Sequence, residues 1–374
     1  MKNLLTILSV ILFLSCSKPQ EYKIPVYGWL GGPGTSTDQE LKDQFTDLKN
    51  KGIDGLMYNG GQDPETYQRV GKIAKEAGLE FHTWIPTMNQ VNPKLKPEWY
   101  AVNGKGESAF DKPAYVSYYK FLCPNREEVY QFLAEMYGAI AEVPEVDAIH
   151  LDYIRFPDVI LGKGLWDKYG LVMDREFPEY DYCYCDKCVD DFKEKSGIDI
   201  KSVEDPSQIQ EWKQFRYDLI TNIVNRLAKV VHEKGKLINA AVFPGPNSVA
   251  KKTTRQEWDK WELDAVFPMN YNDFYLEGPE WVGDVTKEGV TALTASGNKI
   301  PLYSGLFICP NPENKTQEND PENHGLIPGE IETAIRVSME NGAAGICLFT
   351  PGRMTEAGWA EFDKAIRKEY SVLP

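Results

Sequence analysis

The fold is decided by the stretch Ile149-His150-Leu151-Asp152-Tyr153-Ile154-Arg155-Phe156-Pro157. The apolar run at residues 146–151 has the length of a buried strand, and it ends abruptly at an ionisable residue, Asp152. A tyrosine, an arginine and a proline follow and indicate a loop. A carboxylate at the carboxyl end of a buried strand is where (β/α)8-barrel enzymes keep their reactive groups. We therefore expect a barrel with Asp152 at its mouth.

Short apolar runs followed by longer helical patterns recur along the chain, which predicts βα units and a parallel sheet. The eight candidate strands are residues 26–30, 55–59, 80–85, 146–152, 237–243, 265–271, 301–307 and 345–350. Thr37-Asp38-Gln39-Glu40 is a capping box, and Asp63-Pro64 starts a second helix. Eight such units, without a Gly-x-Gly-x-x-Gly loop after the first strand, predict an α/β fold, the (β/α)8 TIM barrel, rather than an open doubly wound sheet.

Two connections are far longer than ordinary βα loops: residues 86–125 after the third strand and residues 153–206 after the fourth. Both leave from the carboxyl ends of strands. We therefore expect both insertions to stand over the catalytic face of the barrel and to shape a substrate cleft.

The first residues are predicted to lie outside the fold. Lys2 precedes an apolar run at residues 4–14 that is too short to span a bilayer and suits a signal peptide. Leu14-Ser15-Cys16 resembles a bacterial lipoprotein signal, in which Cys16 carries lipid; an ordinary secretory signal is the alternative. We expect a signal at 1–15, a tether at 16–23 and one barrel domain at 24–374, anchored by lipid to a membrane of the bacterial cell envelope, in the outer membrane or periplasm.

Composition narrows the class of partner. The chain of 374 residues is 42% hydrophobic and carries a net charge of −15. Such an acidic chain does not suit nucleic acid, whose phosphates need a basic surface. Its 20 tyrosines, 9 tryptophans and 16 phenylalanines are a rich supply of rings, many of which are expected in the core, and sugar-binding clefts also use such rings.

Several motifs resemble the glycosyl-hydrolase-like 10 family, whose members are barrel proteins expected to hydrolyse glycosides. They are Pro97-Glu98-Trp99 with Asn103-Gly104, Leu122-Cys123-Pro124-Asn125 with Glu128-Val129, the Asp152 segment, and Asp264-Ala265-Val266-Phe267-Pro268-Met269-Asn270-Tyr271. The resemblance spans nearly the whole mature chain. Relatives often carry two adjacent acids where this chain has Asp152-Tyr153, so Asp152 is the catalytic carboxylate that the resemblance implies.

Four cysteines form a candidate metal site. Cys183, Cys185 and Cys188 lie too close together to pair easily with one another, and a fourth thiolate would complete a tetrahedral zinc site. Together with Cys123, the cluster is similar to the zinc cluster of family 42 β-galactosidases. We expect a structural zinc that pins the two insertions together, with disulfides as the alternative in an oxidising compartment. Cys309 and Cys347 are expected to be buried thiols.

Hydrolysis of a glycosidic bond needs two carboxyl groups. The common plan with glutamates at strands four and seven does not fit, because those positions hold Asp152-Tyr153 and Ser304-Gly305-Leu306. The arrangement resembles that of family 27 and family 31 α-glycosidases, which implies Asp152 as nucleophile and Asp273 as acid/base. Asp158 and Glu313 are the rivals for the second position. No catalytic cofactor is expected.

Further polar and aromatic residues are expected near the mouth as substrate contacts: Trp29, Tyr58, His82, Trp84, His150, Arg155, Asn270 and Tyr271. His150 is two residues before Asp152 and should also point into the barrel, where a hydrogen-bonded core role is the alternative. Arg155 would bind a substrate hydroxyl or the Asp152 carboxylate, or pair with an acid of its own loop.

The sequence thus predicts an envelope glycoside hydrolase whose substrate is an external carbohydrate. A second prediction stays beside it: a non-catalytic glycan-binding lipoprotein that kept the barrel, because the acid next to Asp152 is missing and fold alone does not determine function.

Overall fold

The structure, a computed structural model, describes residues 23–32, 36–315 and 323–373. The predicted signal at 1–15 and Cys16 lie outside the described residues. The strands are β1 (Val26–Leu30), β2 (Gly55–Tyr58), β3 (Glu80–Thr83), β4 (Ile85–Pro86), β5 (Ala148–Asp152), β6 (Leu237–Val242), β7 (Ala265–Pro268), β8 (Tyr303–Phe307) and β9 (Gly345–Phe349).

The strands are parallel and close into a barrel. Pairing runs from β7 through β6, β5, β3, β2, β1 and β9 to β8. Two isolated parallel bridges, Val266 with Leu302 and Met269 with Gly305, join β8 back to β7. The short β4 continues β3 in the same register against β5, so the two segments act as one strand of eight. The predicted (β/α)8 barrel is confirmed.

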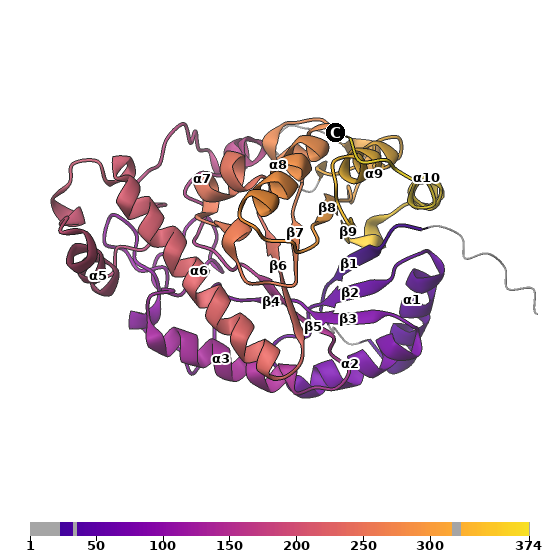
Figure 1. Cartoon of the computed structure of the whole chain (residues 1–374), viewed down its shortest axis with the longest axis horizontal. Helices are drawn as coiled ribbons and strands as arrows, with labels where there is room; N and C mark the ends of the chain where they lie inside the picture. Colours follow the sequence, from indigo (N-terminus) through magenta and orange to yellow (C-terminus); the bar gives the residue numbers. More distant parts are fainter. Residues whose placement is uncertain (1–22, 33–35, 316–322, 374) are drawn as a thin grey trace, which may run out of the picture.

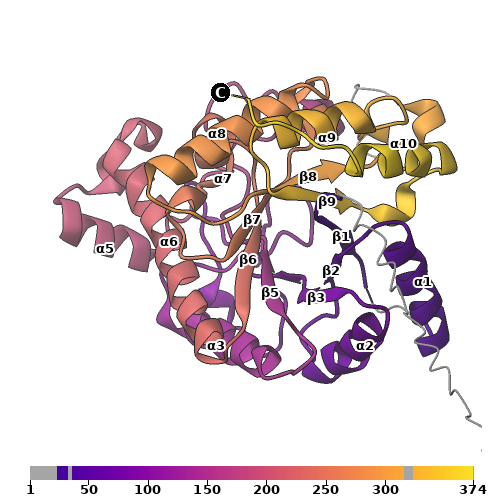
Figure 2. The same ribbon diagram turned by 45° about the vertical axis from the view of Figure 1, so that its right-hand side comes forward.

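Helices surround the strands, as Figures 1 and 2 show. They are α1 (Asp38–Asn50), α2 (Pro64–Glu76), α3 (Glu127–Ala141), α6 (Gln210–Glu233), α7 (Lys251–Thr254), α8 (Trp281–Ala295), α9 (Ile331–Glu340) and α10 (Glu356–Ile366). The predicted caps hold: Thr37 and Glu40 form a capping box at α1, and Asp63 caps α2 ahead of Pro64. None of the described helices combines the length and the apolar character that a membrane span requires.

Both long insertions are present. One runs from Thr87 to Arg126, between β4 and α3, and the other from Tyr153 to Ile209, between β5 and α6. The second contains α4 (Trp166–Tyr169) and α5 (Asp186–Ser196), and α5 stands out beyond α6 at the left of Figure 1. Both leave the carboxyl end of the barrel, as predicted.

The apolar core has two parts, as expected of a filled barrel. The larger part lies between strands and helices and includes Phe45, Leu56 and Phe81. The smaller part fills the barrel itself, with Tyr27, Trp29, Met57, Ala241, Ala265, Phe267 and Cys347. At the carboxyl ends of the strands, this smaller part forms the floor of the candidate site.

Candidate active site

A cavity of about 380 Å³ opens at the carboxyl ends of the strands. More than half of its lining residues are aromatic: Trp29, Trp84, Tyr115, Tyr119, Tyr153, Tyr169, Phe243, Tyr271, Phe274, Tyr275, Phe307 and Phe349. The strands supply the floor, and both insertions together with the segments after β6 and β7 supply the wall. Asp152 and Asp158 are the carboxyl groups among the lining residues.

Asp152 ends β5, and its side chain is 8% exposed at the cavity floor. Each of its oxygens accepts one N–H bond: Oδ2 from Trp84 Nε1 at 2.8 Å and Oδ1 from its neighbour's amide, Tyr153 N, at 2.6 Å. Tyr153 has a φ of 47°, a left-handed backbone that is uncommon for a large side chain and is typical of functional sites. The carboxyl group is therefore held in one orientation.

Burial raises the pKa of the Asp152 carboxyl above its usual range. The hydrogen bonds from Trp84 and Tyr153, and the positive charge of Arg155, act in the opposite direction but do not cancel the effect of burial. A carboxyl with a raised pKa in an apolar pocket keeps its proton to a higher pH than a free carboxyl does, as a proton donor must.

Arg155 lines the cavity, but both of its terminal nitrogens have partners, and Nη2 donates to the Tyr119 hydroxyl of the first insertion at 3.4 Å. Nη1 donates to Asp158 Oδ2 at 2.8 Å and to the Phe156 carbonyl at 2.9 Å. The guanidinium carbon lies 4.9 Å from the Phe243 ring centroid and 5.1 Å from that of Tyr153. Of the alternatives for Arg155, the structure shows the ion pair with a loop acid.

His150 and His82 lie below the cavity, inside the barrel. Trp29 Nε1 donates to His150 Nε2 at 2.9 Å. An indole N–H can only donate, so the His150 proton is on Nδ1, which faces Asn239 Oδ1. Asn239 in turn contacts His82. Burial lowers the pKa of His150 to about 3, so the ring is neutral. These hydrogen bonds fix the orientation of the Trp29 indole. Neither histidine lines the cavity.

Tyr58 and Asn270 are also outside the cavity lining. Tyr58 points away from the barrel, because β2 alternates and Met57 takes the inward position; its ring packs 6.2 Å from that of Phe45 in α1. The Asn270 amide nitrogen donates to Ser304 Oγ at 2.9 Å and to Thr286 Oγ1 at 3.1 Å. Both predicted contacts are thus placed in the core, while Trp29, Trp84, Arg155 and Tyr271 do line the cavity.

Asp273 is not brought together with Asp152 in the cavity. It is 1% exposed in a 3-10 turn, Asn272–Tyr275. Its Oδ2 accepts from Gly325 N at 2.7 Å and pairs with Lys315 Nζ at 3.1 Å. The turn aims the carboxylate at the loop after β8, so the side chain ties two loops together. The rival Glu313 is exposed and does not line the cavity either.

Sequence reasoning missed the cavity wall. Tyr115 and Tyr119 come from the first insertion, Tyr169 from the second, and Phe274 and Tyr275 from the turn after β7. The one available signal was the density of tyrosine in the insertions, because loop residues follow no periodic pattern that would show which way they point.

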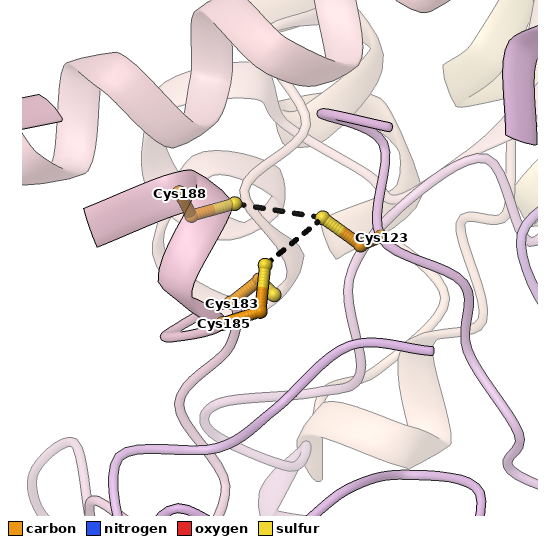
Figure 3. A group of neighbouring side chains, drawn as sticks. All are labelled: Cys123, Cys183, Cys185 and Cys188. Carbon is orange, nitrogen blue, oxygen red and sulfur yellow. Dashed lines mark hydrogen bonds between the residues drawn. The ribbon is translucent and has the colours of Figure 1, made fainter. Parts of the chain in front are cut away.

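The four cysteines predicted as ligands meet, as Figure 3 shows. Cys123 comes from the first insertion, Cys183 and Cys185 precede α5, and Cys188 lies in its first turn. All are buried, their sulfurs lie within 4.8 Å of one another, and none is in a disulfide. Cys123 Sγ is 3.6 Å from Cys185 Sγ and 3.5 Å from Cys188 Sγ. Tetrahedral zinc with bonds of about 2.3 Å would hold sulfurs roughly 3.8 Å apart, so the donor set fits the metal. Cys309 and Cys347 are buried thiols, as predicted.

Comparison with known proteins places the fold among glycoside hydrolases. The PgaB glycoside hydrolase domain from Bordetella bronchiseptica shares 13% identity and a TM-score of 0.64, over 94% of this chain and 100% of that one. A β-galactosidase from the psychrophilic Marinomonas ef1 shares 12% identity and a TM-score of 0.62, over 92% of this chain and 59% of that one. The catalytic domain of β-amylase from Paenibacillus polymyxa shares 13% identity and a TM-score of 0.57, over 93% of this chain and 98% of that one.

At these identities the likeness shows the fold alone. No protein-family model matches the chain, and no curated protein matches it in sequence. The resemblance to glycoside hydrolase barrels therefore holds for the fold, and membership of the glycosyl-hydrolase-like 10 family stays a prediction.

Proposed function

We propose that this protein is a glycoside hydrolase of the bacterial cell envelope that cleaves an external poly- or oligosaccharide. The observation that carries the proposal is Asp152, a buried carboxyl with a raised pKa at the mouth of the barrel, in a cavity walled by aromatic rings. Sugars present apolar C–H faces and hydroxyl groups, and such a cavity suits both. The fold shared with glycoside hydrolases supports the same function, and residues 1–16 support the location.

Asp152 is assigned the proton that the departing glycosidic oxygen needs as its bond to the anomeric carbon breaks. This role follows from its raised pKa and differs from the nucleophile role that the resemblance to families 27 and 31 implies. Asp158 replaces Asp273 as the second carboxyl, because Asp158 lines the cavity and Asp273 does not. We also propose that the cysteine cluster holds a structural zinc ion.

One observation favours a second candidate function, a glycan-binding protein without catalysis. Asp158 forms a buried ion pair with Arg155, with side-chain exposures of 7% and 6%, so Asp152 is the one cavity carboxyl without an ion-pair partner among the described residues. Hydrolysis of a glycosidic bond needs two carboxyl groups that can act on the substrate, and the ion pair leaves one such group in the cavity.

A screen of polysaccharides and 4-nitrophenyl glycosides separates the two functions. We expect the purified protein to release reducing ends or nitrophenol from at least one of them. Binding to a polysaccharide in affinity electrophoresis, with no product from any substrate of the panel, would contradict hydrolysis and support the glycan-binding function.

Asp273→Ala should lower stability and leave hydrolysis largely intact. The substitution removes the acceptor of Gly325 N and one partner of Lys315, which keeps Glu330 at 2.6 Å. Breaking a buried pair of this kind costs about 3 kcal/mol in the free energy of unfolding, measured by urea denaturation. At a temperature where the variant is folded, kcat should stay within about tenfold of wild type. A loss of about 10³-fold in a folded variant would restore Asp273 as the acid.

A further inference from the structure

An exposed aromatic ring lies next to the rings that wall the cavity. Tyr118, in the first insertion, is 58% exposed and is the one exposed Trp, Tyr or Phe in the described part of the chain. A ring of this size left in solvent would normally be turned inward, since burial of an aromatic side chain is favourable. An exposed ring beside a cavity can present its face to a ligand.

Tyr118 belongs to a row of rings that starts at Asp152. Tyr153 follows Asp152 directly, and its ring meets that of Tyr119 at 6.1 Å and 80°. Tyr119 meets Tyr118 at 5.2 Å and 81°. Tyr153 and Tyr119 line the cavity, so the row leads from the candidate catalytic carboxyl to the solvent without a break.

Three phenol groups gather where this row leaves the cavity. Tyr169 of the second insertion joins the row through Tyr115, whose ring lies 6.3 Å from that of Tyr119 and 5.7 Å from that of Tyr169. Within residues 23–32, 36–315 and 323–373, no side-chain hydrogen bond engages the hydroxyls of Tyr118, Tyr153 or Tyr169. Apolar ring faces and unused hydroxyls thus lie together.

We propose that Tyr118, Tyr153 and Tyr169 form an outer glycan subsite, which binds the sugar units next to the one at Asp152. The inference rests on the proposed function and deepens it: the substrate is a chain, and its extension is recognised at this rim. The sugar's C–H face would pack on the Tyr118 ring, and its hydroxyls would bond to the free phenols. The lining carries no unpaired cation, so an uncharged glycan fits it better than an acidic one.

The geometry also explains why the two insertions are joined. Tyr118 comes from the first insertion and Tyr169 from the second, and the cysteine cluster links the same two segments. If the two loops became ordered only when the glycan binds, that ordering would lower the affinity. A subsite shared between loops must therefore be ordered beforehand.

The test is Tyr118→Ala, measured on malto-, cello-, galacto- and chito-oligosaccharide series from monosaccharide to hexasaccharide. Wild type should show kcat/KM rising with chain length in one series. Tyr118→Ala should lower kcat/KM for the longer members by about three- to tenfold, the effect of one lost aromatic contact, and leave the 4-nitrophenyl monosaccharide within twofold. Tyr118→Trp should retain the preference for longer chains. Val91→Ala, a 71% exposed apolar residue of the same insertion away from the cavity lining, is the matched control and should change nothing.

Binding separates this inference from the proposed activity. Calorimetric titration of Asp152→Asn with the same oligosaccharides should show tighter binding for longer chains, weakened by Tyr118→Ala. If wild type hydrolyses nothing but this binding pattern holds, the activity is wrong and the subsite stands. Equal effects of Tyr118→Ala on short and long glycans, or no binding of any oligosaccharide, would overturn the subsite.

Discussion

Asp152→Asn should lower kcat by about 10³-fold on any glycoside that wild type cleaves, because an amide cannot deliver a proton to the leaving oxygen. The protein should remain folded. Asparagine has nearly the same shape, and its one carbonyl oxygen can still accept from Trp84 Nε1 or Tyr153 N, so about one hydrogen bond is lost. The measurement is steady-state kinetics beside thermal unfolding.

The pH dependence follows from the raised pKa of Asp152. The folded carboxyl binds its proton more tightly than the unfolded one, so its contribution to stability is fully present below the unfolded pKa and is lost as the pH rises through the folded pKa. Wild type should therefore lose stability relative to Asp152→Asn over that window. Wild-type kcat should fall with rising pH in the same range, since the proton donor is then ionised.

Asp264→Asn is the matched control for this prediction. Asp264 lies just before β7, at the opposite end of the barrel, where its Oδ2 contacts His232 Nε2 at 2.9 Å and accepts from Ile238 N at 2.8 Å. Its substitution should leave kcat unchanged. Hydrolysis that survives Asp152→Asn would remove Asp152 from the mechanism, whatever the control shows.

The barrel could be predicted because each strand can be recognised from its own local sequence pattern. A buried parallel strand is a short apolar run, and residues at its carboxyl end share one face of the sheet, so the placement of Asp152 at the mouth follows from residues 146–152 alone. The first two residues of that prediction fall outside β5, which begins at Ala148.

The orientation of side chains could be predicted only in part. Period-two alternation correctly turns His150 inward with Asp152, but it does not say that the Trp29 indole covers His150 from above. The position of Asp273 after the strand predicted at 265–271 places it at the carboxyl end of the barrel, yet the turn at Asn272–Tyr275 directs its carboxylate to Gly325 and Lys315. Loop conformation and the filling of barrel layers depend on contacts between distant segments, which one sequence does not encode locally.

The two insertions contact each other at the cysteine cluster and through further hydrogen bonds: Gly104 N donates to the Asp181 carbonyl at 3.0 Å, and Tyr184 N donates to the Val102 carbonyl at 2.7 Å. Besides the four thiols, Tyr184 donates to Asp181 at 2.7 Å, and Asp181 accepts from Arg255 at 3.0 Å and pairs with Arg216. These side-chain contacts bind the second insertion to α6 and to the segment after α7. Cys123 is the contribution of the first insertion to the cluster, and its sulfur faces the other three.

Cys123→Ser should consequently abolish the proposed zinc site and lower the free energy of unfolding by more than about 4 kcal/mol, as loss of a structural metal does. Wild type should contain about one zinc per chain by atomic emission, and 1,10-phenanthroline should reproduce the loss of stability. Hydrogen exchange should rise in both insertions and not in β1 or β2, since those strands make no contact with the thiols. Cys309→Ser, at a buried thiol outside the cluster, should keep the zinc. Wild-type protein that lacks zinc and free thiols would establish disulfides instead, because sulfurs 3.5 Å apart need only a small movement to reach a bond length of about 2.0 Å.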